Sequence, residues 1–383
     1  MKQRPIPYGK QHITDQDINA VVNVLRSDYL TQGPQIELFE DSFKAKIGAK
    51  FAVAVANGTA ALHLSAMALG IQKGQKVITT PITFSASANC VKYCGGDIHF
   101  VDIDPVSYNI DLSKVGEAFS QDKNIKGVIP VNFAGYPVNL EVLKIIADRY
   151  KAWILEDACH SPGGYFLSST GDKLYCGSCD YSDIAIFSFH PVKHIACGEG
   201  GMITTNNPDI YKRLMSLRTH GIVKKPEQTP WYYELEELGF NYRLSDIHAA
   251  LGNSQLERLD ENIASRQNIA NRYYEELKNV GDIVLPKVEA NVHHAFHLFV
   301  ILTSKRDQLY SFLREKGIFT QIHYIPLHYM PYYQQFGWKK GDFPVAEDYY
   351  ERCISLPIFY GLGEDEQGFV IDSIKDFYKK YES

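Results

Sequence analysis

The chain has 383 residues, of which 45% are hydrophobic and 22% are charged, proportions that are usual for soluble globular proteins. Its 39 lysines and arginines oppose 45 aspartates and glutamates, and this slightly acidic balance argues against a nucleic-acid-binding role. No segment approaches the roughly 20 consecutive apolar residues that cross a bilayer, and the first residues lack the apolar core of a secretory signal. We therefore expect a cytoplasmic protein with neither a membrane nor a nucleic acid as its partner.

The first three-fifths of the chain alternates helical stretches with short β-rich runs. Helices are predicted over Asp15–Ser27 and Pro34–Ile47 and after Asn57. The predicted strands are Phe51–Ala56, Lys76–Thr80, Asp97–Val101, Gly127–Asn132, Ala152–Glu156, Ile184–Ser188 and Gly201–Thr204. Several of them are apolar throughout, which is typical of strands buried on both faces. Seven strands with helices between them predict an α/β fold built on one large, mostly parallel sheet.

The last third of the chain has a different pattern. From about Ser245 onward, apolar residues recur at helical spacing, which predicts one long helix that bridges to a second domain. That domain would begin near Val292 with the strand-like FHLFVIL, continue with the helix RDQLYSFLREKG and the segment YIPLH, and close with a helix after Gly363. We predict a large α/β domain over residues 1–250, and a linker helix with a small α+β domain over residues 251–383.

The seven cysteines are an odd set in a large chain, which favours reduced thiols over a disulfide framework. Cys176 and Cys179 form a C-x-x-C pair inside Gly171–Asp180, which we expect to be a mobile loop, as we do Val223–Pro230. Such a pair could bind a metal or act in redox chemistry, but zinc sites of this type need a second ligand pair. An ordinary loop is the favoured interpretation, and we expect no metal.

A first motif joins the strand Phe51–Ala56 to a helix through Asn57, Gly58, Thr59 and Ala60. The first backbone N–H groups of a helix lack partners, so a turn of small residues at this point can bind an anion. The Thr59 hydroxyl could add a hydrogen bond to a phosphate. The alternative is that Asn57 or Thr59 only caps the helix.

A second motif places Asp157 just after the strand Ala152–Glu156. A carboxylate at the carboxyl end of a buried strand lies where α/β sheets place ligand-binding groups. Asp157 could keep a pyridine nitrogen protonated, which makes pyridoxal phosphate an effective electron sink. The alternative is an aspartate that caps the next turn.

A third motif leads from the strand Ile184–Ser188 through Phe-His-Pro-Val to Lys193, and a glycine-rich stretch follows. Apolar surroundings at such a strand end lower the pKa of a lysine and favour the neutral amine, which can attack a carbonyl carbon. A solvated surface lysine is the common alternative. Only the three motifs together, in this order, indicate an enzyme that uses pyridoxal phosphate.

The chain resembles the DegT/DnrJ/EryC1 family of sugar aminotransferases from near its beginning to its end. The matching stretches are LTQGP, ANGTAALH, PITFSASAN, ILEDACHSPG, FSFHPVK, GEGGMITTN, GFNYRLSDIHAALG, HYIPLH and SLPIF. The resemblance implies the fold-type I architecture of pyridoxal-phosphate-dependent transferases. It also implies a homodimer with shared active sites.

The resemblance assigns roles to particular residues. Lys193 would be the catalytic lysine that binds pyridoxal 5'-phosphate covalently, and Asp157 would pair with the pyridinium nitrogen. Phe84 would stack on one face of the cofactor ring, with His160 near the other. The residues that would hold the phosphate are Gly58, Thr59, Ala60 and Ser188.

Two groups of residues complete the expected site. Asn241 would reach the phosphate of the neighbouring subunit's cofactor, although it could equally be a turn residue. The candidate substrate contacts are Tyr8, His190, Arg243, Tyr324 and His328. Because the chain has 25 tyrosines and 20 phenylalanines, packing is the alternative role for its aromatic residues.

Within the family, FSFHPVK and GEGGMITTN are most similar to the transaminases of pseudaminic acid biosynthesis. Those enzymes use L-glutamate to aminate C4 of UDP-2-acetamido-2,6-dideoxy-β-L-arabino-hexos-4-ulose, releasing 2-oxoglutarate. The alternatives are enzymes for a 4-keto arabinose, for perosamine-type sugars or for 3-keto sugars, and a catalytically silent protein with this fold. A branch that performs 3-dehydration has histidine in place of the lysine, so Lys193 argues against it.

Overall fold

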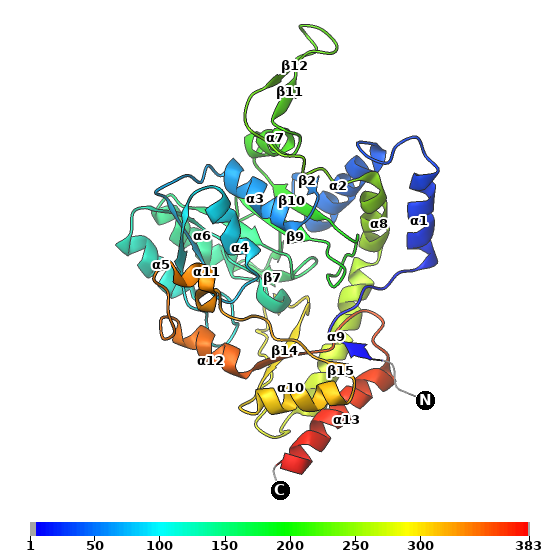
Figure 1. The fold of residues 1–383 in the computed structure, drawn as a ribbon, viewed down its shortest axis with the longest axis vertical. Coiled ribbons are helices and arrows are strands. Elements are labelled where there is room, and N and C mark those ends of the chain that lie inside the picture. The colour runs from blue at the N-terminus through cyan, green and yellow to red at the C-terminus, as the bar shows by residue number, and fades with distance from the viewer. Residues whose placement is uncertain (1–4, 382–383) are drawn as a thin grey trace.

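The computed structural model describes residues 5–381, and a seven-stranded sheet forms the centre of the large domain (Figure 1). Its strands are β2 (Phe51–Val55), β3 (Lys76–Thr79), β4 (Asp97–Phe100), β5 (Ile125–Val128), β6 (Trp153–Asp157), β9 (Ile184–Ser188) and β10 (Gly201–Thr205). They are arranged in the order β2-β10-β9-β6-β5-β3-β4, and only β10 runs antiparallel to its neighbours. The prediction of a large, mostly parallel seven-stranded sheet is therefore confirmed.

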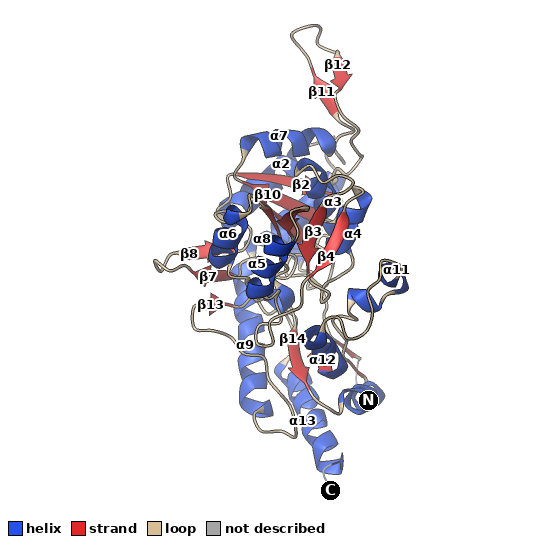
Figure 2. Cartoon of the chain, turned by 90° about the vertical axis from the view of Figure 1, so that its left-hand side faces the viewer, coloured by secondary structure: helices blue, strands red, loops and turns tan. Residues whose placement is uncertain are grey.

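Helices cover both faces of this sheet (Figure 2). They are α2 (Pro34–Ile47), α3 (Gly58–Ala68), α4 (Ala86–Tyr93), α5 (Leu112–Gln121), α6 (Leu140–Arg149), α7 (Pro208–Leu217) and α8 (Asp246–Glu257). A further helix, α1 (Asp15–Leu25), packs on the outer side of α8. In β2, Val53 and Val55 belong to the core formed with α3, α4 and α7, whereas Ala52 and Ala54 belong to the core formed with α2 and α8. Side chains of a strand alternate between its two faces, so an apolar strand of this kind is buried on both.

The predicted long helix is two helices, α8 and α9 (Leu259–Leu277), which meet at Arg258. The Arg258 N–H bonds to the carbonyl oxygen of Gln255 at 3.2 Å, a tighter turn than that of an α-helix. The Arg258 side chain donates to the buried carboxylate of Asp17 on α1 at 2.7 Å. Because α8 packs against α1 and α2, the predicted boundary after residue 250 falls inside a helix of the large domain.

The C-terminal domain pairs β14 (Phe299–Leu302) with β16 (Cys353–Leu356) and packs α9, α10 (Arg306–Glu315) and α13 (Glu364–Tyr381) around one core. The short strand β1 (Ile6–Pro7) also belongs here, because it pairs in parallel with β15 (Ile318–Phe319). β1 therefore belongs to the C-terminal domain, although the large domain follows it in the sequence.

The two domains share a further core. Between β15 and β16 the chain passes through two short helical turns, η2 (Leu327–Tyr329) and α11 (Pro331–Gln334), and through α12 (Pro344–Arg352). Apolar residues of this stretch pack on Phe100 and Phe133 of the large domain. The Asp102 carboxylate accepts hydrogen bonds from the N–H groups of Val345 and Ala346 at 3.1 and 2.9 Å, at the start of α12. We infer that the domains are held in a fixed relation at this contact.

Both segments expected to be mobile loops contain strands. Gly171–Asp180 includes β8 (Lys173–Tyr175), which joins β7 (Tyr165–Leu167) and β13 (Val292–His293) in a small sheet. Cys176 and Cys179 follow β8 and are buried, and the Cys179 thiol donates to the carbonyl oxygen of Thr204 at 3.3 Å. Within residues 5–381, no group of three or more histidine, cysteine, aspartate or glutamate side chains could hold a metal ion.

The second segment belongs to a hairpin of β11 (Ile222–Lys224) and β12 (Tyr233–Leu235) that projects from the large domain (Figures 1 and 2). Its apolar side chains are open to solvent, since Trp231 is 75% exposed and Leu238 is 76% exposed. Among the helices of the described residues, none combines the length and apolar character that a membrane span requires.

Candidate active site

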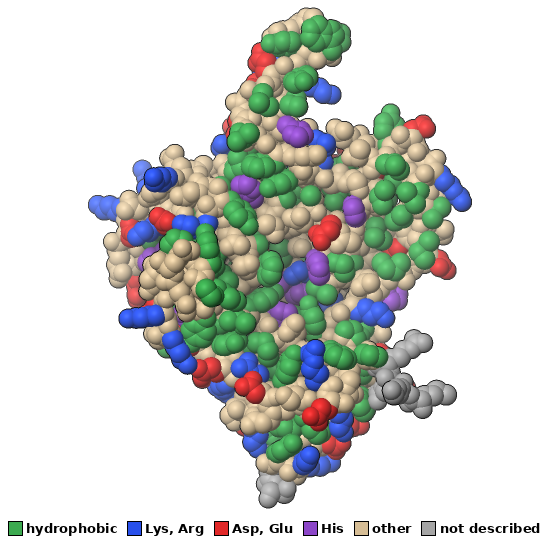
Figure 3. Space-filling view, in the orientation of Figure 1, with side chains coloured by type: hydrophobic (Ala, Val, Ile, Leu, Met, Phe, Trp, Pro, Cys, Tyr) green, Lys and Arg blue, Asp and Glu red, His purple; other side chains and the backbone are tan. Residues whose placement is uncertain are grey.

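A cavity of about 460 Å³ lies at the carboxyl ends of β6 and β9, beside the start of α3 and against the C-terminal domain. Histidine side chains gather near the middle of this face of the molecule (Figure 3). The predicted residues that line the cavity are Tyr8, Gly58, Thr59, Phe84, Asp157, His160, Ser188, His190, Lys193 and Tyr324. The fold therefore brings the lysine, the carboxylate and the small-residue turn to one cavity, although they are far apart in the chain.

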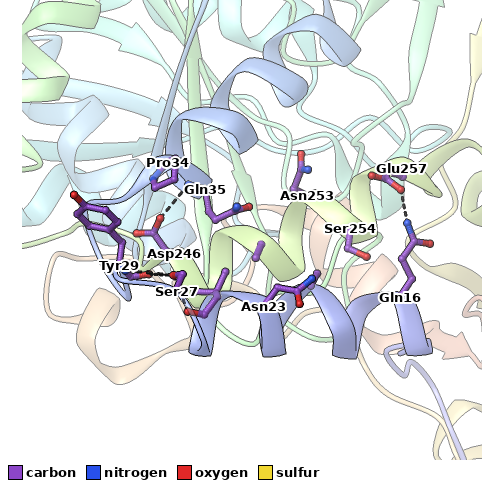
Figure 4. Close-up of a pocket in the computed structure, with 13 residues that line it drawn as sticks. Gln16, Asn23, Ser27, Tyr29, Pro34, Gln35, Asp246, Asn253, Ser254 and Glu257 are labelled. Atoms are coloured by element: carbon purple, nitrogen blue, oxygen red, sulfur yellow. Dashed lines mark hydrogen bonds between the residues drawn. The ribbon is translucent and has the colours of Figure 1, made fainter.

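A second hollow of about 320 Å³ lies between α1 and α8 (Figure 4). Gln16 donates to Glu257 across it at 2.5 Å. The Asp246 carboxylate accepts from the N–H groups of Gly33 and Gln35, which start α2 and lack helical partners. Among the described residues that line it there is no lysine, arginine, histidine or cysteine. Helix capping and packing account for this hollow, and we assign no chemistry to it.

The turn after β2 is built as an anion site. The Oδ1 atom of Asn57 accepts a hydrogen bond from the Ala60 N–H at 2.8 Å, so Asn57 caps α3. Gly58 and Thr59, whose N–H groups precede the first intrahelical bonds, line the cavity, where the positive end of the helix dipole favours an anion. Ala60 does not line the cavity and its N–H already has a partner. Its predicted phosphate contact is therefore not supported.

Two glycines allow this turn to approach the ends of β9 and β10. A side chain at Gly58 would place its Cβ atom 2.9 Å from the Cβ atom of Ser188. A side chain at Gly201 would place its Cβ atom 2.5 Å from the carbonyl oxygen of Asn57. Both separations are too short for real atoms. With glycine at both positions, the Ser188 hydroxyl lies beside the helix start, where the resemblance places the phosphate.

Lys193 follows β9 in a turn closed by its N–H, which donates to the carbonyl oxygen of His190 at 2.8 Å. Burial lowers the pKa of the Lys193 ammonium, while Cys159 and Asp157 act in the opposite direction. A lowered pKa favours the neutral amine, which is the nucleophilic form. The Nζ atom lies 3.4 Å from Nε2 of His297.

Asp157 ends β6 and is only 5% exposed. Its Oδ2 atom accepts from the hydroxyl of Ser87 at 2.7 Å, and its Oδ1 atom accepts from the Cys159 N–H at 3.1 Å. The Ser87 hydroxyl is in turn 2.9 Å from that of Thr83. These bonds from both sides fix the plane of the carboxylate at the cavity wall.

Glu156 precedes Asp157 and points to the opposite side of the strand, as alternation requires. Its carboxylate accepts from the side-chain amide of Asn132 at 2.7 Å and from the Gly177 N–H at 3.0 Å. Burial raises the pKa of Glu156 to about 7. Glu156 therefore ties the end of β6 to the turn after β8, which the sequence analysis took for a loop.

Aromatic and histidine side chains form the rest of the cavity wall. The ring of His160 lies 4.2 Å from that of His297, and its Nε2 atom lies 3.3 Å from the Tyr324 hydroxyl. Phe84 stands at the mouth and is 61% exposed. Burial, chiefly, lowers the pKa values of His160, His297 and His323, so these imidazoles are neutral at pH 7. His297 and His323 were not among the predicted site residues, although His297 lies in the histidine-rich HHAFHLF and His323 begins the matching stretch HYIPLH.

Besides Ala60, three predicted residues do not line the cavity. Asn241 and Arg243 form isolated β-bridges with Thr219 and Val55, at the base of the projecting hairpin. His328 is fully buried, with its Nε2 atom 2.9 Å from a carboxylate oxygen of Glu347. The predicted substrate contact of His328 is corrected to a packing role, because a side chain enclosed in this way cannot reach a ligand in the cavity.

The arrangement fits pyridoxal phosphate. Small-molecule sites usually have volumes of roughly 300–1,000 Å³, and this cavity lies in that range. It offers an amine for the aldehyde, a carboxylate for the pyridine nitrogen and a helix start for the phosphate. The described residues thus supply each group that the cofactor requires.

Comparisons with known proteins agree with this geometry. A sequence model of the DegT/DnrJ/EryC1/StrS aminotransferase family matches residues 11–375. The chain is 36% identical to the spore coat polysaccharide biosynthesis protein SpsC of Bacillus subtilis, with 98% of this chain and 97% of that protein covered. It is 32% identical to the UDP-4-amino-4,6-dideoxy-N-acetyl-β-L-altrosamine transaminase of Campylobacter jejuni, with 98% of both covered.

The fold is also that of a solved relative. The PLP form of Spr1654 from Streptococcus pneumoniae superposes with a TM-score of 0.90 at 26% identity, covering 98% of this chain and 99% of that one. This chain belongs to the DegT/DnrJ/EryC1/StrS aminotransferase family and is a pyridoxal-phosphate-dependent sugar aminotransferase.

Proposed function

We propose that the enzyme transfers the amino group of L-glutamate to C4 of UDP-2-acetamido-2,6-dideoxy-β-L-arabino-hexos-4-ulose. The likeness to the Campylobacter jejuni transaminase along nearly the whole chain supports this substrate. The observation that carries the chemistry is the single cavity shared by Lys193, Asp157 and the turn at Gly58. Because SpsC is more similar to the chain, at 36% identity against 32% for that transaminase, keto sugars of the 4-keto arabinose, perosamine or 3-keto type are the alternatives to be tested.

Lys193 is the proposed acid and base. When bound, pyridoxal phosphate supplies an electron sink for the carbon that carries the amino group. The neutral Lys193 amine would take the proton from the α-carbon of glutamate and would return it to the carbon on the far side of the amino nitrogen. In the second half-reaction the same amine moves a proton in the opposite direction, toward C4 of the sugar. Burial lowers the pKa of the Lys193 ammonium, which favours the unprotonated amine that the first transfer requires.

The other residues of the cavity wall are proposed to hold and orient the cofactor and the substrate. Asp157, fixed by Ser87 and the Cys159 N–H, keeps the pyridine nitrogen protonated and so sustains the electron sink. Phe84 and His160 are proposed to lie on the two faces of the cofactor ring. Tyr8, His190 and Tyr324, which line the same cavity, are the proposed substrate contacts.

A homodimer is part of the proposal. Asn241 and Arg243 do not line the cavity of their own chain. They lie at the base of the hairpin, whose exposed Trp231 and Leu238 form the kind of apolar surface that a partner covers. A second copy would bury these side chains and bring Asn241 to the neighbouring phosphate and Arg243 to the neighbouring substrate.

Mixed dimers test the shared site. Lys193→Ala and Asn241→Ala are each expected to be impaired as separate proteins. After unfolding and refolding together, half of the dimers are mixed, and each has one site with both natural residues. Activity should return to about a quarter of the natural level. A mixture no more active than its components, or a monomer in sedimentation, would contradict the shared site.

The substrate is tested with a panel of UDP-linked keto sugars. The enzyme is loaded with pyridoxal phosphate, supplied with L-glutamate, and offered the L-arabino 4-keto sugar, its C5 epimer, the UDP-linked 4-keto arabinose and a 3-keto sugar. Products are identified by mass and NMR, and kcat/KM is compared. The L-arabino 4-keto sugar should be preferred. A higher kcat/KM for any other member of the panel would replace the proposed substrate by that sugar.

A further inference from the structure

His297 comes from the C-terminal domain and reaches the amine of Lys193, with Nε2 and Nζ 3.4 Å apart. It is 4% exposed. We propose that His297 is a positioning residue: its neutral imidazole accepts a hydrogen bond from the Lys193 amine whenever that amine is free of the cofactor. The inference rests on the proposed role of Lys193.

The backbone that presents His297 is strained and held in place. Phe296 has φ +46°, a left-handed conformation that is unusual for a residue with a side chain. The N–H groups of Ala295 and Leu298 donate to the carbonyl oxygens of Gly135 and Ala134 at 2.9 and 3.1 Å. Strain of this kind persists where the surroundings over-determine the backbone, and it is concentrated at functional sites.

Gly135 makes this close approach possible. It has φ +100°, and a side chain there would place its Cβ atom 2.9 Å from the Phe296 nitrogen and 3.0 Å from the His297 nitrogen. The large domain therefore leaves room at one glycine for the segment that carries His297.

A buried arginine holds the same segment from the other side. Arg266 on α9 is 1% exposed, and its Nη1 atom donates to the carbonyl oxygens of Phe296, His297 and Ile358 at 3.2, 3.3 and 3.0 Å. Three carbonyl oxygens on one guanidinium fix the backbone at His297. The histidine is thus placed by ties to both domains.

The charge states decide the direction of the hydrogen bond. Burial, the charge of Lys193 and the neighbouring His160 lower the pKa of His297 well below its ordinary value. The imidazole is therefore neutral. When Lys193 is protonated its ammonium group can only donate, so in that state Nε2 accepts and the ring proton lies on Nδ1. The bond keeps the released amine within reach of the cavity and stabilises the ammonium formed when Lys193 has taken a proton.

Other groups also act on the Lys193 amine and must be considered in any titration. Cys159 and Asp157 raise its pKa, and Arg266 lowers it. The charge of Lys193 is also felt by three buried neutral histidines besides His297, namely His160, His194 and His323. All of these are unchanged in the variants below, so differences between variants report on residue 297.

The test compares His297→Phe, His297→Asn and His297→Gln with the natural protein. Glutamine can place an oxygen where Nε2 lies, whereas asparagine is polar but shorter, and phenylalanine removes the acceptor. The first measurement is the rate at which the apoprotein attaches pyridoxal phosphate as a function of pH, whose midpoint reports the pKa of Lys193. The midpoint should fall by about half a unit to one unit in the Phe and Asn variants and return toward the natural value in the Gln variant.

The second measurement is the isotope effect with L-glutamate deuterated at the α-carbon. A misplaced amine slows proton transfer, so the half-reaction should become about tenfold slower in the Phe and Asn variants, with a larger isotope effect than the natural enzyme shows. His293→Phe is the matched control. It makes the same change four residues earlier, where the ring stacks on Tyr165 outside the cavity, and it should alter neither the midpoint nor the isotope effect.

The possible outcomes distinguish a failure of the role proposed for His297 from a failure of the role proposed for Lys193. Borohydride reduction followed by peptide mass identifies the lysine that carries the cofactor, and a lysine other than Lys193 removes the proposed function and this inference together. If Lys193 is labelled but the midpoint and isotope effect stay natural in both the Phe and the Asn variants, only the role of His297 is overturned. If the His297→Phe variant does not fold, the comparison of His297→Asn with His297→Gln still tests the role of His297.

Discussion

The two walls of the cavity are held by different kinds of backbone. The large-domain wall consists of the ends of regular elements, since β6 ends at Asp157, β9 ends at Ser188 and α3 begins at Gly58. The C-terminal wall consists of irregular segments that carry His297 and Tyr324. Regular elements satisfy their backbone groups through a repeating pattern, whereas an irregular buried segment needs individual partners. The first wall is thus specified locally, and the second is specified by contacts between domains.

This difference indicates which wall can bind the cofactor and which wall can act on proton transfer. The large-domain wall offers the groups for the cofactor, which stays through both half-reactions. The C-terminal wall offers the uncharged imidazoles of His297 and His323 and the Tyr324 hydroxyl, in the cavity that holds the Lys193 amine. We expect substitutions in the first wall to act mainly on cofactor binding and chemistry, and substitutions behind the second wall to act on stability and proton transfer.

The largest effect is expected for Lys193→Ala. Loss of the amine removes both the covalent attachment and the acid and base, so turnover should fall by more than about a thousandfold and the visible absorbance of the bound cofactor should disappear. Absorbance spectra and 2-oxoglutarate release measure the two effects. Lys173→Ala, a change at an exposed lysine outside the cavity, is the control. A Lys193→Ala protein that completes transamination would falsify the assignment.

Asp157→Asn is expected to come next. A neutral amide cannot hold the charge of a pyridinium, so kcat should fall by about a hundredfold or more. The amide oxygen can still accept from the Cys159 N–H, and the amide NH2 can donate to the Ser87 hydroxyl, which donates to the carboxylate in the natural protein, so the fold should persist. Initial rates and thermal unfolding measure these effects. A rate near that of the natural enzyme with an unchanged melting curve contradicts the role of the carboxylate.

Gly58→Ala tests the phosphate turn. Its Cβ atom would lie 2.9 Å from that of Ser188, so the turn or Ser188 must shift and phosphate contacts weaken. The affinity for pyridoxal phosphate should fall about tenfold. Titration of the apoprotein measures it. Gly116→Ala, whose Cβ atom would be in ordinary contact with Ile146 at 3.8 Å, should bind the cofactor like the natural protein, and equal affinities in both variants would count against the turn.

Arg266→Met tests the second wall through stability. The substitution leaves carbonyl oxygens of Phe296, His297 and Ile358 without their donor, so the free energy of unfolding should fall by roughly 2–4 kcal/mol. Urea unfolding measures it. Arg213→Met, which removes an exposed ion pair with Glu237, should cost at most about 1 kcal/mol. A loss of unfolding free energy of similar size in both variants would contradict the role of Arg266 in holding the second wall.

The pH dependence of stability at Glu156 tests the large-domain wall. Burial raises its pKa in the folded protein to about 7 from an ordinary value of 4.5, so the folded state binds this proton more tightly than the unfolded state. The group therefore favours folding below pH 4.5, and that contribution is lost as pH rises to 7. Glu156→Gln has no titrating carboxyl at this position and so does not lose stability in this way. The free energy of unfolding of the variant minus that of the natural protein should therefore increase by roughly 3 kcal/mol between pH 4.5 and pH 7. A pH-independent difference contradicts the raised pKa.

The sequence was informative where local pattern decides structure. The strands of the large sheet could be predicted to within a few residues because apolar runs such as Ile184–Ser188 are buried on both faces. Lys193, Asp157 and Gly58 could be predicted because each stands at the junction of a strand with a turn, where α/β sheets bind ligands.

The rest depends on contacts that no local pattern records. The break at Arg258 follows from its bond to Asp17, and His328 is buried by Glu347. The loop at Gly171–Asp180 is ordered by Glu156 and Thr204. His297 was missed because its position depends on Arg266 and Gly135, both distant in sequence. Its left-handed neighbour Phe296 gives no compositional signal, since glycine or asparagine would be expected there.

The pairing of Ile6 with Ile318 has a consequence for how the chain is made. Of the two strands, β1 is made first, and its partner β15 follows only after more than three hundred further residues have been joined. The large domain lies between them and can fold meanwhile, because its strands and helices are close together in sequence. The smaller domain, and with it the wall that carries His297, can be completed only after β15 and β16 have been made. The growing chain therefore cannot have a finished active site before its last third has emerged.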